Sequence, residues 1–141
     1  MSRRIVIDTH VLVAGLRSRH GASYRLLSRL GSGQFEHVVS VVLLLEYEDA
    51  PKRPGLGIRI GRAAIDDVLD FVCASAIRQD IYFLWRPVLR DPRDDFVLEA
   101  AVHGGCEAIV TFNVRDFVGA DRFGIAVRTP QQFLDSIGVS K

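Results

Sequence analysis

The sequence lacks the features that define several protein classes. Only two cysteines are present, Cys73 and Cys106, and they show neither CxxC nor Cys/His spacing, so we expect buried reduced thiols rather than disulfides or a zinc site. The longest apolar runs, such as residues 38–45, are far too short to cross a bilayer, and no cleavable signal pattern follows the first residues. We therefore expect a cytoplasmic protein without membrane contacts.

Glycine-rich phosphate loops and a serine-centred nucleophile elbow are missing as well. Without GxGxxG or GxxxxGK[ST], the sequence gives no sign of dinucleotide or P-loop nucleotide binding. Lysine is scarce, at 2 residues against 16 arginines, and the net charge is only +1. This balance gives no general reason to expect nucleic acid, although arginine suits bidentate phosphate contacts.

The composition is that of one globular domain. With 141 residues, 48% of them apolar and 25% charged, the chain is long enough to bury a single core. It contains no internal repeat and no low-complexity tract. We therefore predict a single domain over residues 1–141.

Strand-like and helix-like segments alternate along the chain. This order predicts an α/β fold with a central parallel sheet and helices on both faces. The expected strands are residues 4–8, 37–40, 81–85, 107–112 and 124–128, and the expected helices are residues 22–31, 41–50, 63–77, 94–105 and 129–138. Residues 51–62, rich in proline, glycine and cations, are expected to form a mobile basic loop.

Two acids stand where such a fold places chemistry. Asp8 ends the first apolar run, and ligands of open parallel sheets bind at the carboxyl ends of the strands. Alone, it is equally well explained as the N-cap of the next helix. Glu46 follows the apolar residues 41–45, which suggests a partly buried carboxylate that needs a partner. The alternative is a solvated glutamate at the far end of its helix.

More polar residues come later, in DPRDD and after the strand that follows it. DPRDD opens a helix, so one of its acids is expected to be a cap. Because Asp94 and Asp95 are adjacent, one can face a site while the other stays in solvent. Thr111, Asn113 and Asp116 follow the next strand, and Asp116 either adds a fourth carboxylate or caps a short turn.

These acids are expected to converge at one edge of the sheet. Chance explains the convergence of all four acids less well than it explains the position of any one of them. Crowded carboxylates repel one another, and a hard cation such as Mg²⁺ or Mn²⁺ relieves the repulsion. Such a site suits metal-assisted hydrolysis of phosphodiesters. A haloacid-dehalogenase-type phosphatase would need a second aspartate two residues after Asp8, where this chain has His10.

Together these segments resemble the PIN-domain ribonucleases, in particular the bacterial VapC-like branch of toxins from toxin–antitoxin pairs. The resemblance rests on the order and spacing of IDTHVLVAGL, VVSVVLLLEYEDAPKRP, DPRDDFVLEAAVHGGCEAIVTFNVRDF and IAVRTPQQFL, which cover nearly the whole chain. It implies a three-layer PIN-like fold and a ribonuclease that cuts single-stranded RNA with Mg²⁺ or Mn²⁺. It also implies a homodimer and an antitoxin protein that occludes the site.

The resemblance also assigns roles to particular residues. Asp8 and Glu46 match the family's first two acids, and the pattern DPxDxxxL makes Asp94 the third. The chain reads TFNVRDF, so Asp116 matches the fourth acid of members that have Asn at this point. The branch usually has Asn at the position of His10. Residues expected to support the four acids are Thr9, Asp95, Thr111 and Asn113.

Arginines are the expected contacts to RNA phosphates, and such contacts make binding dependent on salt. The predicted set is Arg17, Arg53, Arg59 and Arg62. A solvated basic face is the alternative. Two other functions stay open from the residues: a PIN-fold RNA-binding regulator without turnover, and a small phosphatase or receiver-like domain that uses Asp8 as a phosphoacceptor.

Overall fold

A parallel sheet forms the centre of the molecule. The computed structural model describes residues 3–81 and 89–139, and these form five strands in the order β3-β2-β1-β4-β5, with every pair parallel. The strands are β1 (Arg4–Ile7), β2 (Glu36–Val39), β3 (Ala76–Arg78), β4 (Ala108–Val110) and β5 (Ala126–Arg128). The predicted α/β class with a parallel sheet is therefore confirmed.

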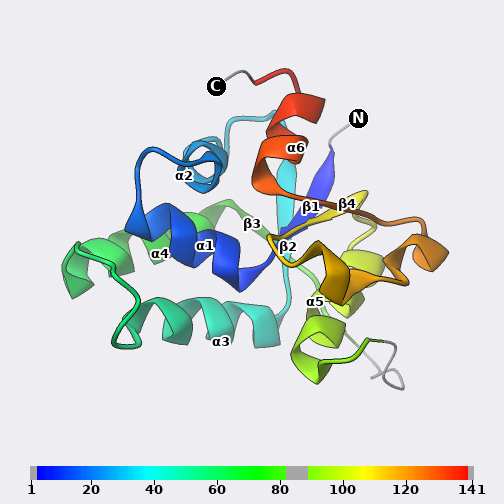
Figure 1. The fold of residues 1–141 in the computed structure, drawn as a ribbon, viewed down its shortest axis with the longest axis horizontal. Helices are drawn as coiled ribbons and strands as arrows, with labels where there is room; N and C mark the ends of the chain where they lie inside the picture. Colours follow the sequence, from blue (N-terminus) through cyan, green and yellow to red (C-terminus); the bar gives the residue numbers. More distant parts are fainter. Residues whose placement is uncertain (1–2, 82–88, 140–141) are drawn as a thin grey trace.

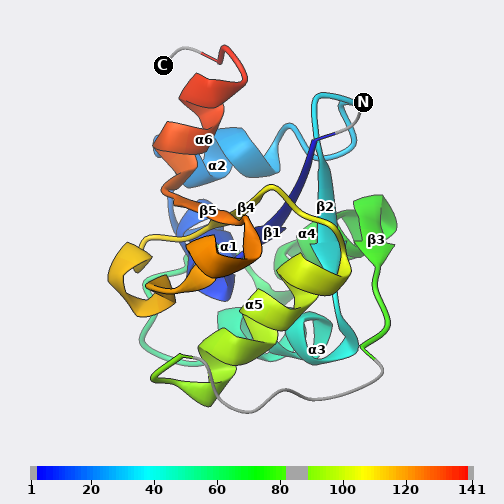
Figure 2. The same cartoon turned by 90° about the vertical axis from the view of Figure 1, so that its right-hand side faces the viewer.

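Helices cover both faces of this sheet. The α-helices are α1 (Thr9–Arg17), α2 (Ala22–Leu27), α3 (Val41–Asp49), α4 (Arg62–Ser75), α5 (Pro92–His103) and α6 (Pro130–Ser136), and the short 3₁₀ helices are η1 (Ala50–Lys52), η2 (Val114–Phe117) and η3 (Ala120–Phe123). Figures 1 and 2 show α1 and α4 on one face and α5 on the other. Helix α3 runs past the carboxyl ends of the strands (Figure 1). Among the described residues, no helix has the length and apolarity needed to cross a membrane.

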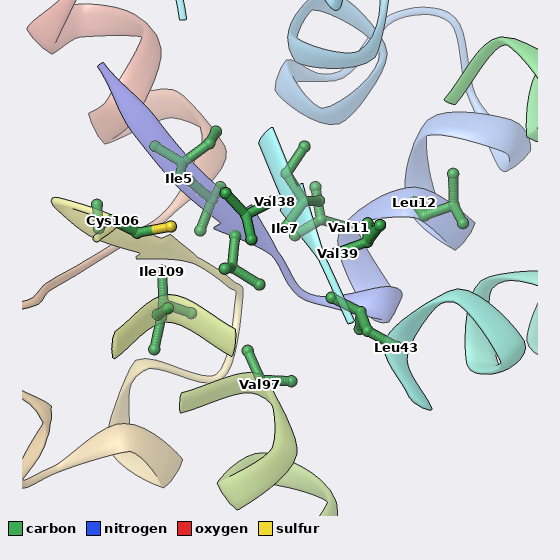
Figure 3. Packing of buried hydrophobic residues seen from close by; sticks show 14 of the residues in the cluster. Ile5, Ile7, Val11, Leu12, Val38, Val39, Leu43, Val97, Cys106 and Ile109 are labelled. Atoms are coloured by element: carbon green, nitrogen blue, oxygen red, sulfur yellow. The ribbon is translucent and has the colours of Figure 1, made fainter. Parts of the chain in front are cut away.

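The core forms between the sheet and its two helical layers. Figure 3 shows Ile5 and Ile7 of β1 with Leu12 of α1 and Val97 of α5 around them, and all four side chains are buried. A strand that is buried on both faces needs a continuous apolar run, which explains why β1 reads IVI rather than an alternating pattern. Burial also raises the pKa of the Cys106 thiol to about 12, so this cysteine is a core residue.

The final helix begins as its sequence predicts. Thr129 accepts a hydrogen bond from the backbone N–H of Gln132 at 3.2 Å, while the Gln132 side chain accepts one from the N–H of Thr129 at 2.9 Å. Pro130 occupies the first turn, where its missing N–H is not needed. This reciprocal capping box fixes the start of α6.

Three expectations about the elements need correction or limitation. Helix α1 was not among the predicted helices, because Gly15 and the β-branched valines weaken its helical pattern. A Cβ on Gly15 would lie 2.4 Å from Cδ1 of Leu27, so the glycine allows α2 to pack closely on α1. The helix predicted through residue 77 ends at Ser75, and Ala76 begins β3. Ile81 is not in a strand, and the rest of the strand predicted at residues 81–85 lies outside the described residues.

Candidate active site

The four predicted acids line one cavity of about 190 Å³ beyond the carboxyl ends of β1 and β4. Each acid comes from a different part of the chain: the start of α1, the middle of α3, the first turn of α5, and η2. The acids are Asp8, Glu46, Asp94 and Asp116. The fold therefore brings together side chains that are up to about a hundred residues apart in the sequence, as expected for the ligand edge of a parallel sheet.

Asp8 is the most deeply buried of the four acids, with 5% of its surface exposed. It occupies the N-cap position of α1, but its side chain makes no capping hydrogen bond. Instead, Oδ2 accepts a hydrogen bond of 2.7 Å from the hydroxyl of Thr111, which follows β4. The preceding residue is also fixed, because the Tyr47 hydroxyl donates to the carbonyl oxygen of Ile7. The capping explanation for Asp8 is therefore wrong.

The electrostatics of the cavity disfavour its own negative charge. Burial raises the pKa of Asp8, against the hydrogen bond from Thr111 and the nearby His10, which lower it. Burial, followed by the charges of Asp8, Asp91 and Asp116, raises the pKa of Asp94 to about 6. A cavity in which carboxylates resist ionisation favours a bound cation, because the cation stabilises their charged forms.

The segment DPRDD divides its acids among three tasks. Asp91 caps α5 by accepting a 2.9 Å hydrogen bond from the backbone N–H of Arg93. Asp94 lines the cavity. Asp95 is buried on another face of the helix and accepts a 3.0 Å hydrogen bond from the N–H of Leu89. The expectation that one of the adjacent aspartates stays in solvent is wrong, since Asp95 instead fixes the chain that enters α5.

Glu46 lines the cavity, but for a different reason from the one expected. Its apolar neighbours do not bury it: Val41 and Leu45 expose 66% and 64% of their surfaces, and Val42 is also exposed. Only one side of α3 packs inward, through residues such as Leu43. Glu46 is half-buried because its helix passes the open end of the sheet, and not because the helix itself is a core element.

Other polar side chains connect the first turn of α1 to the end of β4. The backbone N–H of Asn113 donates to Oγ1 of Thr111 at 3.0 Å, and its side-chain Nδ2 lies 3.3 Å from Nδ1 of His10. Asp116 is exposed, and η2, on which it lies, has no side-chain cap, so a capping role for Asp116 is not observed. Thr9 is buried on the cavity wall, and among the described residues its hydroxyl has no hydrogen-bond partner.

Arginine side chains line the cavity on two sides. Arg53, after η1, was predicted, and it pairs with Asp49 at 2.6 Å. Arg93 was missed, since nothing in the pattern DPRDD distinguishes it from a solvated charge. Within the described residues, Arg59 and Arg62 are exposed away from the cavity wall.

Arg17 has a different place. Its Nη1 lies 3.5 Å from the carbonyl oxygen of Leu56, so it connects α1 to the predicted basic loop rather than to the acids.

The donor set fits a hard divalent cation. Carboxylate oxygens and a buried hydroxyl are ligands that Mg²⁺ and Mn²⁺ accept. Within residues 3–81 and 89–139, no three acidic, histidine or cysteine side chains already stand in a chelating arrangement. Binding of an ion therefore requires the carboxylates around the cavity to rotate inward, as expected for like charges that repel one another.

Comparison with protein families identifies a match to most of the chain. The PIN domain family matches residues 4–115, which contain three of the four cavity acids. No curated protein matches the chain.

Proposed function

The chain belongs to the PIN-domain family, a family of nuclease-type hydrolases that act on RNA, and from this premise we propose that it is a metal-dependent endoribonuclease of single-stranded RNA. The observation that carries the proposal is the convergence of four carboxylates from four segments on one cavity, where the pKa of Asp94 rises to about 6. A structural explanation of each acid alone does not account for this convergence.

In this proposal Asp8, Glu46, Asp94 and Asp116 hold Mg²⁺ or Mn²⁺. A bound divalent cation supplies Lewis-acid activation of the phosphate and of the attacking water. The protein positions the ligands. The Thr111 hydroxyl donates a hydrogen bond to Oδ2 of Asp8 and so orients that carboxylate, and the buried hydroxyl of Thr9 offers a further oxygen ligand.

RNA phosphates need cationic contacts beside this cavity. We assign the first of these to Arg53, which lines the cavity opposite α5, and a second to Arg93 at the start of α5. Figure 1 shows the end of α3 and the start of α5 on opposite sides of the first turn of α1. The exposed residues Arg17, Arg59 and Arg62 are assigned to RNA phosphates farther from the cavity. In this proposal the RNA backbone passes over the four acids, from Arg53 on one side of the cavity to Arg93 on the other.

Further parts of the proposal concern partners and location. We propose a homodimer, an antitoxin protein that occludes the cavity, and a cytoplasmic location. The exposed apolar side chains of α3, which are Val41, Val42 and Leu45, support a protein partner on this helix. Size-exclusion chromatography with light scattering tests the dimer, and a monomer at micromolar concentration would remove it from the proposal.

The decisive experiment is cleavage of a labelled single-stranded RNA in the presence of Mn²⁺. Asp8→Asn and Asp94→Asn are expected to abolish cleavage and to retain the folded state, because each substitution removes a ligand while relieving repulsion. The matched control is Asp95→Asn, which changes the adjacent carboxylate on another face of α5 and is expected to have a smaller effect on cleavage once its stability is taken into account.

Three outcomes would contradict the assigned metal site or the nuclease activity. Near-wild-type cleavage by Asp94→Asn would remove the assigned metal site. RNA binding without cleavage by the wild type would favour a PIN-fold regulator. A covalent phosphate on Asp8 after incubation with a small phosphodonor, seen by intact mass, would favour the receiver-like alternative.

A further inference from the structure

His10 brings an imidazole nitrogen to the acidic cavity. Its Nδ1 lies 3.8 Å from Oδ2 of Asp8 and 3.3 Å from Nδ2 of Asn113, and the residue lines the cavity. The side chain is 71% exposed, so water is available around most of the ring. The nitrogen nevertheless faces the buried carboxylate, which places a nitrogen donor beside the first acid of the proposed site.

The contacts around His10 show which ring nitrogen faces the cavity. The side-chain nitrogen of Asn113 lies 3.3 Å from Nδ1, so Nδ1 is turned towards the polar groups at the end of β4. Asn113 is itself held, because its backbone N–H donates to Thr111, whose hydroxyl donates to Asp8. Nδ1 of His10 therefore lies beside a small group of polar residues, joined by hydrogen bonds, that includes the Asp8 carboxylate.

We propose that His10 is a ligand of the cation in this cavity, and that it makes the site prefer a divalent transition-metal ion to Mg²⁺. The inference rests on the metal-binding role given to the cavity under the proposed function. Neutral imidazole is a common metal ligand, and it suits transition-metal ions. Mg²⁺ instead demands an octahedral shell of oxygen atoms and is reluctant to lose its waters.

The required movement is small. Two ligands at right angles around an ion, each about 2.1 Å away, stand about 3 Å apart. The present separation of 3.8 Å between Nδ1 of His10 and Oδ2 of Asp8 closes to that value by a modest rotation of an exposed side chain. The contact between His10 and Asn113 is given up, and the metal–nitrogen bond replaces it.

The test compares metal affinities in the absence of RNA. Melting temperatures are measured for the wild type, His10→Asn and His20→Asn during titration with Mg²⁺, Mn²⁺ and Co²⁺. His20 is an exposed histidine outside the cavity, so its variant controls for adventitious surface binding. Asparagine at position 10 keeps a smaller, polar side chain, so His10→Asn removes the imidazole without placing an apolar group at the cavity.

The expected result is graded by the ion. The affinity of His10→Asn for Mn²⁺ should fall about tenfold, and its affinity for Co²⁺ should fall further, as the order of transition-metal affinities requires. Its affinity for Mg²⁺ should change by less than about twofold, since an oxygen-seeking ion gains little from the imidazole. Electron spin-echo modulation of bound Mn²⁺ should show a directly coordinated nitrogen in the wild type and none in His10→Asn.

The outcomes separate this inference from the function on which it rests. If all three ions protect the wild type but His10→Asn lowers their affinities equally or not at all, His10 is not a ligand and the nuclease site stands without it. An absent nitrogen signal with bound Mn²⁺ would lead to the same conclusion. If no ion protects the wild type, both the metal cavity and the His10 assignment are overturned.

Discussion

Replacing Asp94 with Asn removes one of the charges that crowd the acidic cavity in the metal-free protein. The pKa of Asp94 is raised to about 6 by burial and then by Asp8, Asp91 and Asp116. Because this pKa lies above the value of 3.8 for a free aspartate, ionised Asp94 destabilises the folded state. The penalty is absent when the carboxyl is protonated in both states, grows as the pH rises between these two pKa values, and is complete above about pH 6.

The size of the effect follows from the shift. Raising the pKa of Asp94 by about two units corresponds to a loss of roughly 3 kcal/mol in the free energy of unfolding if solvent screening is ignored. Asp94 is only partly buried, and solvent reduces the interaction of such a group, so about 1 kcal/mol is a realistic gain for Asp94→Asn above pH 7. For a domain of this length, that gain raises the melting temperature by about 3 °C.

The assay is thermal unfolding in the presence of a chelator at about pH 7.5 and at about pH 3, which lie above and below both pKa values of Asp94. Asp94→Asn should melt about 3 °C above the wild type at the higher pH, and the two proteins should melt together at the lower pH. Asp121→Asn, an exposed change on η3, controls for the loss of a charge outside the cavity. A gain that is equal at both pH values, or a loss at the higher one, would refute the electrostatic reasoning.

Two further substitutions test the position of the first acid and the path of the RNA. Thr111→Val removes the hydroxyl that donates to the buried carboxylate of Asp8. This substitution should lower the free energy of unfolding by about 1–2 kcal/mol in urea titrations of the metal-free protein. An unchanged free energy of unfolding would argue against the hydrogen bond. Changing Arg53 and Arg93 together to Gln should reduce the slope of log RNA affinity against log salt by about 1.4, whereas the same change at Arg59 and Arg62 should reduce it less. Equal slopes for the two double variants would mean that the arginines of the cavity contribute no more to phosphate binding than Arg59 and Arg62.

Strands β1, β2, β4 and β5 were predictable because their signals are local and physical, whereas the first two residues of β3 were assigned to a helix. Buried parallel strands need short continuous apolar runs, and β1 and β4 are such runs. Helix α1 escaped prediction because its packing is a tertiary property: Gly15 lowers the helix propensity, but Leu27 of α2 occupies the space that a side chain would need. A sequence pattern contains the first fact and not the second.

The acids of the site were predictable for the same topological reason, since the ends of parallel strands meet at one edge. Their surroundings were not. The apolar residues of α3 suggested burial, but the helix lies at the margin of the fold, so Leu45 is exposed. Arg93 was hidden by its neighbours, because a cation between three aspartates reads as a solvated charge. Only the fold shows that it shares the cavity wall with Asp94.

The first turn of α1 gives the clearest connection between local structure and function. Three other α-helices begin with a polar side chain that caps them: Ser40, Asp91 and Thr129 each accept a backbone N–H of the first turn. Asp8 has the N-cap backbone conformation, and aspartate is among the best capping residues, yet its carboxylate bonds to Thr111 across the sheet edge. The chain thus forgoes a capping bond, which is typically worth about 1 kcal/mol, to hold a buried carboxylate in a crowded acidic cavity. Because a side-chain cap is present at these three helix starts and absent at Asp8, the departure supports the proposal that this carboxylate is held for binding a cation rather than for stability.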